Sequence, residues 1–286
     1  MPGIVIGVDG SESASLALQW AAREAELHGW ELTALLAWGY LTQYHLDPDA
    51  PFDPNYDEEK AHAVLTAYVE RALGPERSQT VRCRPVCDLP AGALLEAAAD
   101  ADLVVVGARG LGGFKGMLLG SVSQHVVHHA TRPTAIVREI APSDTERIVV
   151  GVDGSDTSRR ALHWAVEEAR LRQASLAVVH TWHLPYVGGY PYTAGSFDPA
   201  PFEEAARQTL DSVADGADAT GLPAPIHRIL HLGDAASGIL EAADGADLVV
   251  VGSRGLGGFS GMLLGSVGHH VAHHAVCPVV IIPPGG

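Results

Sequence analysis

The sequence has little cysteine and no long apolar run. Its 286 residues include 3 cysteines, an odd and sparse count that builds no disulfide framework and is typical of a reducing compartment. The opening stretch, MPGIVIGVDGSES, lacks the basic and extended apolar regions of a secretory signal. No segment reaches the roughly 18 apolar residues that a transmembrane helix requires. We therefore expect a cytoplasmic protein that has no membrane partner.

Positive charge is also scarce. Lysine and arginine number 18 against 34 aspartates and glutamates, which gives a formal net charge of −16. A surface of this sign repels nucleic acids and anionic lipids, so neither is expected as a partner. The hydrophobic content of 47% is normal for a globular protein with a real core.

One unit is written twice along the chain. The stretch GIVIGVDGSESASLALQWAAREAELHG starts at residue 3 and returns as RIVVGVDGSDTSRRALHWAVEEARLRQ at residue 147. LLEAAADADLVVVG likewise returns as ILEAADGADLVVVG. A period this long is a whole domain and not a solenoid repeat. We expect two domains, residues 1–142 and 143–286, that meet in the Pro/Ser/Asp-containing stretch EIAPSDTER.

Each half alternates short apolar runs with helical patterns. Runs such as IVIGVD and LVVVG are typical of parallel strands buried on both faces. This pattern predicts an α/β fold with two tandem doubly wound domains, each a five-stranded parallel sheet with helices on both faces. In the first half we expect strands at 4–9, 31–38, 81–86, 102–107 and 134–138, and helices at 13–28, 56–73, 90–100 and 120–130.

A glycine-rich segment follows the fourth expected strand of each half. VGARGLGGFKGMLLGS recurs as VGSRGLGGFSGMLLGS, and both copies have the spacing G-x2-G-x9-G-S. Glycines before a helix N-terminus allow close backbone approach and offer N–H donors to a phosphate. A Walker A loop does not fit, because Lys115 precedes Gly116 and Ser260 replaces the lysine in the second copy. The G-x-G-x-x-G fingerprint of dehydrogenases does not fit either.

This spacing resembles the ATP-binding motif of the universal stress protein family. The resemblance includes GVDGS at each domain start, DLVVVGSRG before the loop and HHAVCPVVII near the end, and it covers essentially the whole chain. It implies the strand order 3-2-1-4-5 and binding of ATP, with or without Mg²⁺. It also implies a homo-oligomer such as a dimer, or a pseudo-dimer formed by the two domains of one chain.

The resemblance also implies which residues surround the nucleotide. In the first half these are Asp9, Ala37, Gly107, Arg109, Gly110, Gly120, Ser121 and Val122. In the second half they are Asp153, Thr181, Gly252, Arg254, Gly255, Gly265, Ser266 and Val267.

These residues differ in the chemistry that we expect of them. The glycines, serines and valines would place N–H and hydroxyl groups at the phosphates, and the arginines either add charge or are simply solvated. The aspartates either accept hydrogen bonds from ribose or adenine or cap a helix start. Asp88 stands where the second half has Gly233, so the first site is the weaker candidate if only one binds.

Catalysis is not expected beyond weak ATP hydrolysis. Neither half shows the second acidic cluster that a phosphoryl-transfer site needs or the G-x-S-x-G elbow of a hydrolase. We expect an ATP-binding stress-response or regulatory protein whose nucleotide occupancy controls conformation or partner binding. The alternatives are a slow Mg-dependent ATPase or phosphotransferase, and a scaffold that binds no nucleotide.

Two further features leave alternatives open. HHVAHH has the i, i+4 histidine spacing of zinc proteins, but neither H-E-x-x-H nor a nearby cysteine pair completes it, which favours surface histidines. The long Pro- and Tyr-containing segments after the second strand of each half are lids, partner surfaces or tolerated insertions.

Overall fold

The chain divides into two compact units. The computed structural model describes residues 3–39, 43, 51–111, 119–138, 146–184, 198–256 and 264–285. One unit contains residues 1–142 and 272–286, and the other contains residues 143–271. The expected boundary between residues 142 and 143 lies outside the described residues and stays a prediction.

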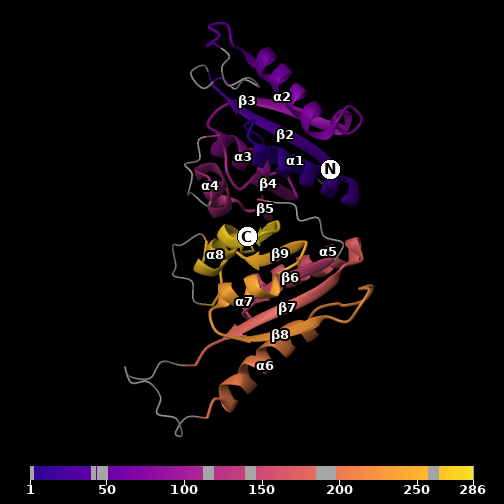
Figure 1. Cartoon of the computed structure of the whole chain (residues 1–286), viewed down its shortest axis with the longest axis vertical. Coiled ribbons are helices and arrows are strands. Elements are labelled where there is room, and N and C mark those ends of the chain that lie inside the picture. Colours follow the sequence, from indigo (N-terminus) through magenta and orange to yellow (C-terminus); the bar gives the residue numbers. More distant parts are fainter. Residues whose placement is uncertain are drawn as a thin grey trace, which may run out of the picture. The chain divides into compact units, whose positions relative to one another are not determined.

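The strands of the first unit form a parallel sheet in the expected order. The sequence of neighbours is β3-β2-β1-β4-β5, and Figure 1 labels all of these strands except β1. Ile4 in the central strand lies opposite both Leu32 and Leu103. The strand bounds are β1 (Gly3–Gly7), β2 (Glu31–Trp38), β3 (Val81–Cys87), β4 (Leu103–Gly107) and β5 (Thr134–Val137). Strand β10 (Val279–Ile282) also belongs to this unit and pairs antiparallel with β5, so the sheet is mostly parallel.

Four α-helices of the first unit pack in two pairs. Helix α1 lies beside α2, and α3 lies beside α4, as right-handed crossovers between parallel strands require. The helices are α1 (Glu12–His28), α2 (Glu58–Leu73), α3 (Pro90–Ala98) and α4 (Ser121–His129), and a short 3-10 helix covers Arg77–Thr80. The core between the layers includes Ile4, Ile6, Leu18, Leu35 and Leu103, all nearly inaccessible to solvent.

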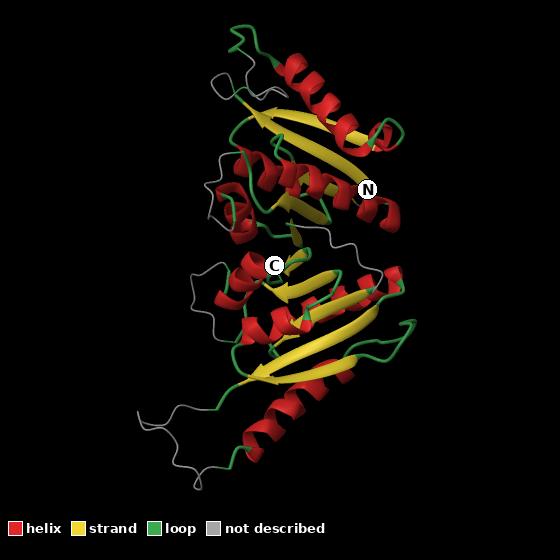
Figure 2. Ribbon diagram, in the orientation of Figure 1, coloured by secondary structure: helices red, strands yellow, loops and turns green. Residues whose placement is uncertain are grey.

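The second unit repeats most of this pattern. Its sheet has the order β9-β6-β7-β8, and all these neighbours are parallel (Figure 2). The strands are β6 (Arg147–Val152), β7 (Ser175–Trp182), β8 (His227–Leu232) and β9 (Leu248–Gly252). The helices are α5 (Asp156–Arg172), α6 (Ala200–Asp215), α7 (Ala235–Ala242) and α8 (Ser266–His274), the last of which continues into the other unit. In the described part of the chain, no helix is both long enough and apolar enough to cross a membrane.

Strand β1 ends earlier than the apolar run suggests. The run predicted a strand through Asp9, but β1 stops at Gly7. The cause is local, because the Asp9 carboxylate accepts a hydrogen bond from the Ser11 amide at 3.0 Å and bends the chain. Ser11 then caps α1 by accepting a hydrogen bond from the Ala14 amide at 3.1 Å.

Candidate functional site

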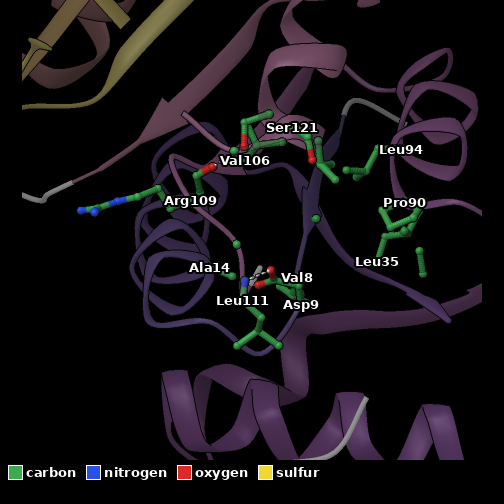
Figure 3. Close-up of a pocket in the computed structure, with 17 residues that line it drawn as sticks. Val8, Asp9, Ala14, Leu35, Pro90, Leu94, Val106, Arg109, Leu111 and Ser121 are labelled. Carbon is green, nitrogen blue, oxygen red and sulfur yellow. Dashed lines mark hydrogen bonds between the residues drawn. The ribbon is translucent and has the colours of Figure 1, made fainter. Parts of the chain in front are cut away.

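A cavity opens at the carboxyl ends of β1 and β4 in the first unit. Its volume is about 280 Å³, close to the lower end of the usual range for ligand pockets. Figure 3 shows Asp9 and Leu111 at one side of the cavity and Ser121 at another. All eight residues that the sequence suggested for this half line the cavity: Asp9, Ala37, Gly107, Arg109, Gly110, Gly120, Ser121 and Val122.

Asp9 ties the glycine loop to the end of β1. One carboxylate oxygen accepts the Ser11 amide proton, and the other accepts that of Leu111 at 2.9 Å. The second bond joins residues that lie 102 positions apart in the sequence. Each carboxylate oxygen has a second lone pair, so Asp9 can still accept a hydrogen bond from a ligand.

Close backbone approach explains two of the loop glycines. A Cβ atom at Gly110 would lie 2.4 Å from Oδ2 of Asp9, and one at Gly107 would lie 2.8 Å from Oγ of Ser13. A Cβ atom at Gly107 would also lie 2.9 Å from the backbone of Ser13, so this position requires glycine. At Gly110 the Asp9 carboxylate would have to move, which would disturb its hydrogen bonds to Ser11 and Leu111. The glycines thus allow the strand end, the β1–α1 turn and the loop to surround one cavity.

The N-terminus of α4 faces this cavity without a side-chain cap. Gly120 occupies the N-cap position, and its own amide bonds to the carbonyl of Ala108 at 2.8 Å. Ser121 and Val122, the first two helical residues, line the cavity. An uncapped first turn presents N–H donors and the positive end of the helix dipole. This end of the cavity is therefore suited to an anionic group.

The other end of the cavity is apolar. Leu35, Pro90 and Leu94 gather there in Figure 3, and Ala37, only 5% exposed, contributes to the lining. Arg109 contrasts with them, since Figure 3 shows its side chain extending away from the other lining residues. The contact of Arg109 with the β1–α1 turn is made by its backbone, because its amide donates a hydrogen bond to Oγ of Ser13 at 3.2 Å.

The second unit builds the same loop closure. Asp153 accepts the amide protons of Ser155 at 3.0 Å and Leu256 at 2.7 Å. A Cβ atom at Gly255 would lie 2.2 Å from the Asp153 carboxylate, and the Gly265 amide bonds to the carbonyl of Ser253 at 2.7 Å. Burial raises the pKa of Asp153, but hydrogen bonds from Ser155, Leu256 and Ser158 outweigh it and hold the pKa below its usual range.

The remaining expected residues of the second unit lie on the same elements as their counterparts. Gly252 ends β9, Thr181 lies near the end of β7, and Ser266 and Val267 begin α8. Among the described residues, Nε of Arg254 is buried without a hydrogen-bond partner, as is Oγ of Ser253. Both residues lie between Gly252 and Gly255, at the start of the second glycine loop.

The turn before the third helix differs between the units. Gly233 has φ 145°, a conformation that residues with a side chain rarely adopt, and its amide bonds to Trp182. Asp88 at the corresponding position is not among the described residues with positive φ, and its amide bonds to Val86. The two turns therefore follow different paths, although both precede a helix.

Sequence reasoning missed three residues that support the first site. Oγ of Ser11 donates to the carbonyl of Arg109 at 3.3 Å, and Ser13 accepts from the amide of the same residue. The sequence did contain a signal for Ser11 and Ser13, because the second copy of the repeat has a hydroxyl-bearing residue at each corresponding position. Tyr68 of α2 donates its hydroxyl proton to the Ser11 carbonyl at 2.9 Å, and nothing in the repeat marks it.

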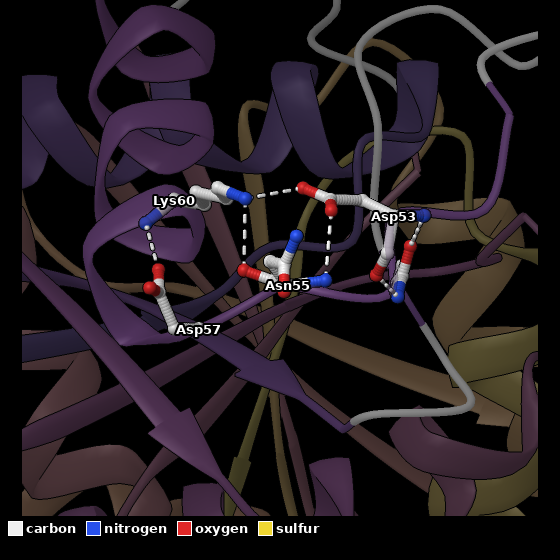
Figure 4. Close-up of polar contacts among 5 residues, drawn as sticks. Asp53, Asn55, Asp57 and Lys60 are labelled. Atoms are coloured by element: carbon white, nitrogen blue, oxygen red, sulfur yellow. Dashed lines mark hydrogen bonds and ion pairs between the residues drawn. The ribbon is translucent and has the colours of Figure 1, made fainter.

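Part of the long segment after β2 is ordered by polar contacts. Nζ of Lys60 bonds to Asp53 at 2.5 Å and to the Asn55 carbonyl at 2.8 Å, and Asp57 caps α2 (Figure 4). Tyr56 is buried and meets Trp38 edge-on with ring centroids 5.7 Å apart. The tips of both long segments, residues 44–50 and 185–197, lie outside the described residues, so their role as lids stays a prediction. Lys115 and Ser260 of the glycine loops also lie outside the described residues.

The fold and the two loops together define a tandem doubly wound α/β protein with a glycine loop after the fourth strand of each copy. The model of the universal stress protein family matches residues 2–138 and again 145–283. The chain belongs to the universal stress protein family.

Proteins of known sequence and structure agree with this assignment. A universal stress protein of Mycolicibacterium smegmatis is 35% identical, with 99% of this chain and 97% of the relative covered. One from Mycobacterium tuberculosis is 34% identical over 98% of this chain and 95% of its own length. The crystal structure of a universal stress protein from Archaeoglobus fulgidus has a TM-score of 0.67 at 22% identity, covers 99% and 98% of the two chains, and supports the fold.

Proposed function

We propose that each unit binds one adenine nucleotide, ATP with or without Mg²⁺, and that its occupancy regulates the protein in a cytoplasmic stress response. The observation that carries the proposal is the uncapped N-terminus of α4, which opens into a cavity whose opposite end is apolar. A nucleotide has the matching polarity, because its phosphates are anionic and its base is a flat ring with apolar faces.

Each part of the cavity has a role in this proposal. The amides of Ser121 and Val122 and the Ser121 hydroxyl would donate to phosphate oxygens. Asp9 would accept a hydrogen bond from a ribose hydroxyl through a free lone pair, and Leu35 and Pro90 would contact the base. Asp153, Ser266 and Val267 would do the same work in the second unit.

Occupancy would act on the glycine loops. In each unit a carboxylate–amide bond is among the contacts that join the glycine loop to the turn after the first strand. A ligand that contacts both the loop and this turn would stabilise the closed arrangement. A ligand present at about a hundred times its Kd stabilises the folded state by about 2.7 kcal/mol. We propose that this gain controls the surface offered to a partner, either a second copy of the chain or the other unit of the same chain.

The first test is to identify what the purified protein carries. Denaturing it and analysing the supernatant by chromatography should release up to two adenine nucleotides per chain. A protein purified empty should show a rise in melting temperature with ATP and a smaller one with inorganic triphosphate, which lacks the base and ribose. No released nucleotide together with no thermal shift would overturn the proposal.

The same preparation separates a binding protein from a slow ATPase. In a single-turnover experiment with Mg²⁺, bound ATP should remain intact over many hours. Hydrolysis of the bound ATP over that period would instead indicate a slow ATPase.

A further inference from the structure

Helix α4 carries two exposed histidines one turn apart, His125 and His129. Their imidazole rings are stacked, with centroids 4.2 Å apart and planes inclined by 22°. Histidines at i and i+4 face the same side of a helix, so both rings point to one place on the surface. This pair lies outside the nucleotide cavity, whose α4 residues are Ser121, Val122 and Ser123.

A hydrogen bond fixes the protonation of one ring. Nδ1 of His129 lies 2.8 Å from the carbonyl oxygen of His125. A carbonyl oxygen can only accept, so Nδ1 carries the proton and Nε2 of His129 keeps its lone pair. Metal-binding histidines commonly have this arrangement, in which a bond from one ring nitrogen to a carbonyl orients the other nitrogen as a ligand.

We propose that His125 and His129 together bind a divalent late transition-metal ion of the kind that prefers imidazole, with Zn²⁺ as the probe. Zn–N bonds are about 2.0–2.1 Å, so two nitrogens on one tetrahedral ion lie about 3.3 Å apart. Rings whose centroids are 4.2 Å apart reach that separation by a small tilt. Water molecules complete the coordination, which makes this an open two-histidine site.

The electrostatic surroundings favour a cation on balance. Both rings lie in the last two turns of α4, which ends at His129, where the helix dipole is negative. The formal charge of −16 raises the local concentration of cations. The positive charge that lies nearest to the pair in the sequence, and that would repel a bound cation, is Arg132. Its guanidinium donates a hydrogen bond to the Ala99 carbonyl at 2.9 Å.

The second half keeps histidines at the corresponding positions of α8, His270 and His274. It also keeps His273, which corresponds to His128, and adds His269 where the first half has Gln124. Zinc bound by α8 would add to the number of zinc ions bound per chain. The test therefore compares variants with the wild type and does not rely on that number alone. His163 is a suitable control, because it is an exposed histidine on α5 with no histidine one turn away.

The experiment is an isothermal titration of the full-length chain with Zn²⁺, run on the wild type and on His125→Gln, His129→Gln and His163→Gln variants. Either α4 variant should lose one zinc equivalent, or show that site weakened by more than about tenfold, since even partners of a metal ligand contribute about 10–100-fold. The His163→Gln variant should bind like the wild type. Equal melting temperatures without metal would show that the exposed substitutions leave the fold intact.

A spectroscopic measurement makes the test independent of stoichiometry. With one equivalent of Cu²⁺, electron paramagnetic resonance should show fewer coordinated imidazole nitrogens in the His125→Gln variant than in the wild type. The proposal is overturned if both α4 variants titrate and give spectra like the wild type. It is equally overturned if His163→Gln loses as much binding, because that result would mean nonspecific binding to surface histidines.

Discussion

The turn that follows the first strand has the same backbone in both units and a different support in each. Ser11 has φ −70° and ψ 159°, and Ser155 has φ −68° and ψ 159°. The Ser11 carbonyl accepts a hydrogen bond from Tyr68, 57 residues away, whereas the Ser155 carbonyl accepts one from Ser158 at 2.9 Å, three residues away. Both carbonyls also accept the amide of the residue four positions on. The additional bond to the serine carbonyl is therefore long-range in the first unit and local in the second.

The start of the third helix shows a second difference of this kind. Leu89 and Asp234 occupy equivalent N-cap positions, with φ and ψ of −70° and 135° in one and −67° and 136° in the other. Asp234 accepts from the Ser237 amide at 2.9 Å, while Leu89 has no side chain that can cap and is 76% exposed. The backbone is thus shared, but only the second unit uses it for a cap.

The largest effect is expected where both units depend on the same close contact. Gly255→Ala should place a methyl group against the Asp153 carboxylate, displace the loop and lower the free energy of unfolding by about 2–3 kcal/mol. ATP stoichiometry, measured by calorimetry, should fall from two to one, and Gly110→Ala should remove the other equivalent. Gly92→Ala is the matched control, because its Cβ would have only an ordinary contact of 3.6 Å with Asp88. Unchanged ATP binding in both loop variants would show that the glycine contacts do not shape the sites.

Removing the charge of Asp153 should have the next largest effect. Hydrogen bonds to a charged group contribute about 1.5–3 kcal/mol, so Asp153→Asn should cost about 1.5–2 kcal/mol at pH 7. Because its pKa is lowered in the folded state, the carboxylate stabilises the fold fully above about pH 4, and this contribution is lost as the pH falls further. Urea unfolding between pH 2.5 and 7 should show a shallower acid loss in the variant. An equally steep loss would contradict this role for the carboxylate.

The two supports of the first turn can be tested against each other. Tyr68→Phe removes the long-range bond and should cost about 1–1.5 kcal/mol, and Ser158→Ala should cost about 1 kcal/mol in the second unit. Burial, and after it the charge of Asp9, raise the pKa of Tyr68. Above pH 10 the unfolded chain therefore loses this proton first, and stability falls as the pH rises. Denaturation series from pH 8 to 11 should show a flatter decline for Tyr68→Phe and no such change for Ser158→Ala.

The smallest expected effect is an exchange of helix caps. Leu89→Ser should stabilise α3 by about 0.5–1 kcal/mol, since its backbone already has the geometry of a capping residue. Asp234→Ala should destabilise α7 by a similar amount. Leu89→Ala serves as the control that removes the exposed leucine without adding a cap. If Leu89→Ser and Leu89→Ala have equal unfolding midpoints, the capping difference between the units has no energetic weight.

Much of the fold could be predicted because its signals are local. Apolar runs marked the strands, and helical patterns between them marked helices such as the one expected at 13–28, which the structure has as α1. Because the pattern occurs twice in the chain, two stretches of sequence indicated each element. The resemblance to the family, and not the local pattern, indicated the eight residues of the first half that line the cavity. They meet there because parallel strands bring their carboxyl ends together.

The features that escaped prediction depend on contacts across the sequence. The bond from Tyr68 to Ser11 depends on how α2 lies over the β1–α1 turn. The periodicity of the sequence does not contain this information. The antiparallel pairing of Val279 with Ile136 joins the last strand of one copy of the repeat to the last strand of the other, whereas the sequence suggested only parallel strands. The stacking of His125 on His129 follows from spacing, but the tautomer of His129 needs the helix geometry.

The carboxylate–amide bonds that close the two glycine loops also provide a pair of internal reporters. The Leu111 amide donates to Asp9, and the Leu256 amide donates to Asp153, so each proton is shielded from solvent only while its own loop stays closed. Exchange of these two protons with deuterated water would measure the opening of each loop separately within one molecule. A ligand that enters one unit first would slow exchange at one leucine and leave the other unchanged, which would reveal the order in which the two sites fill.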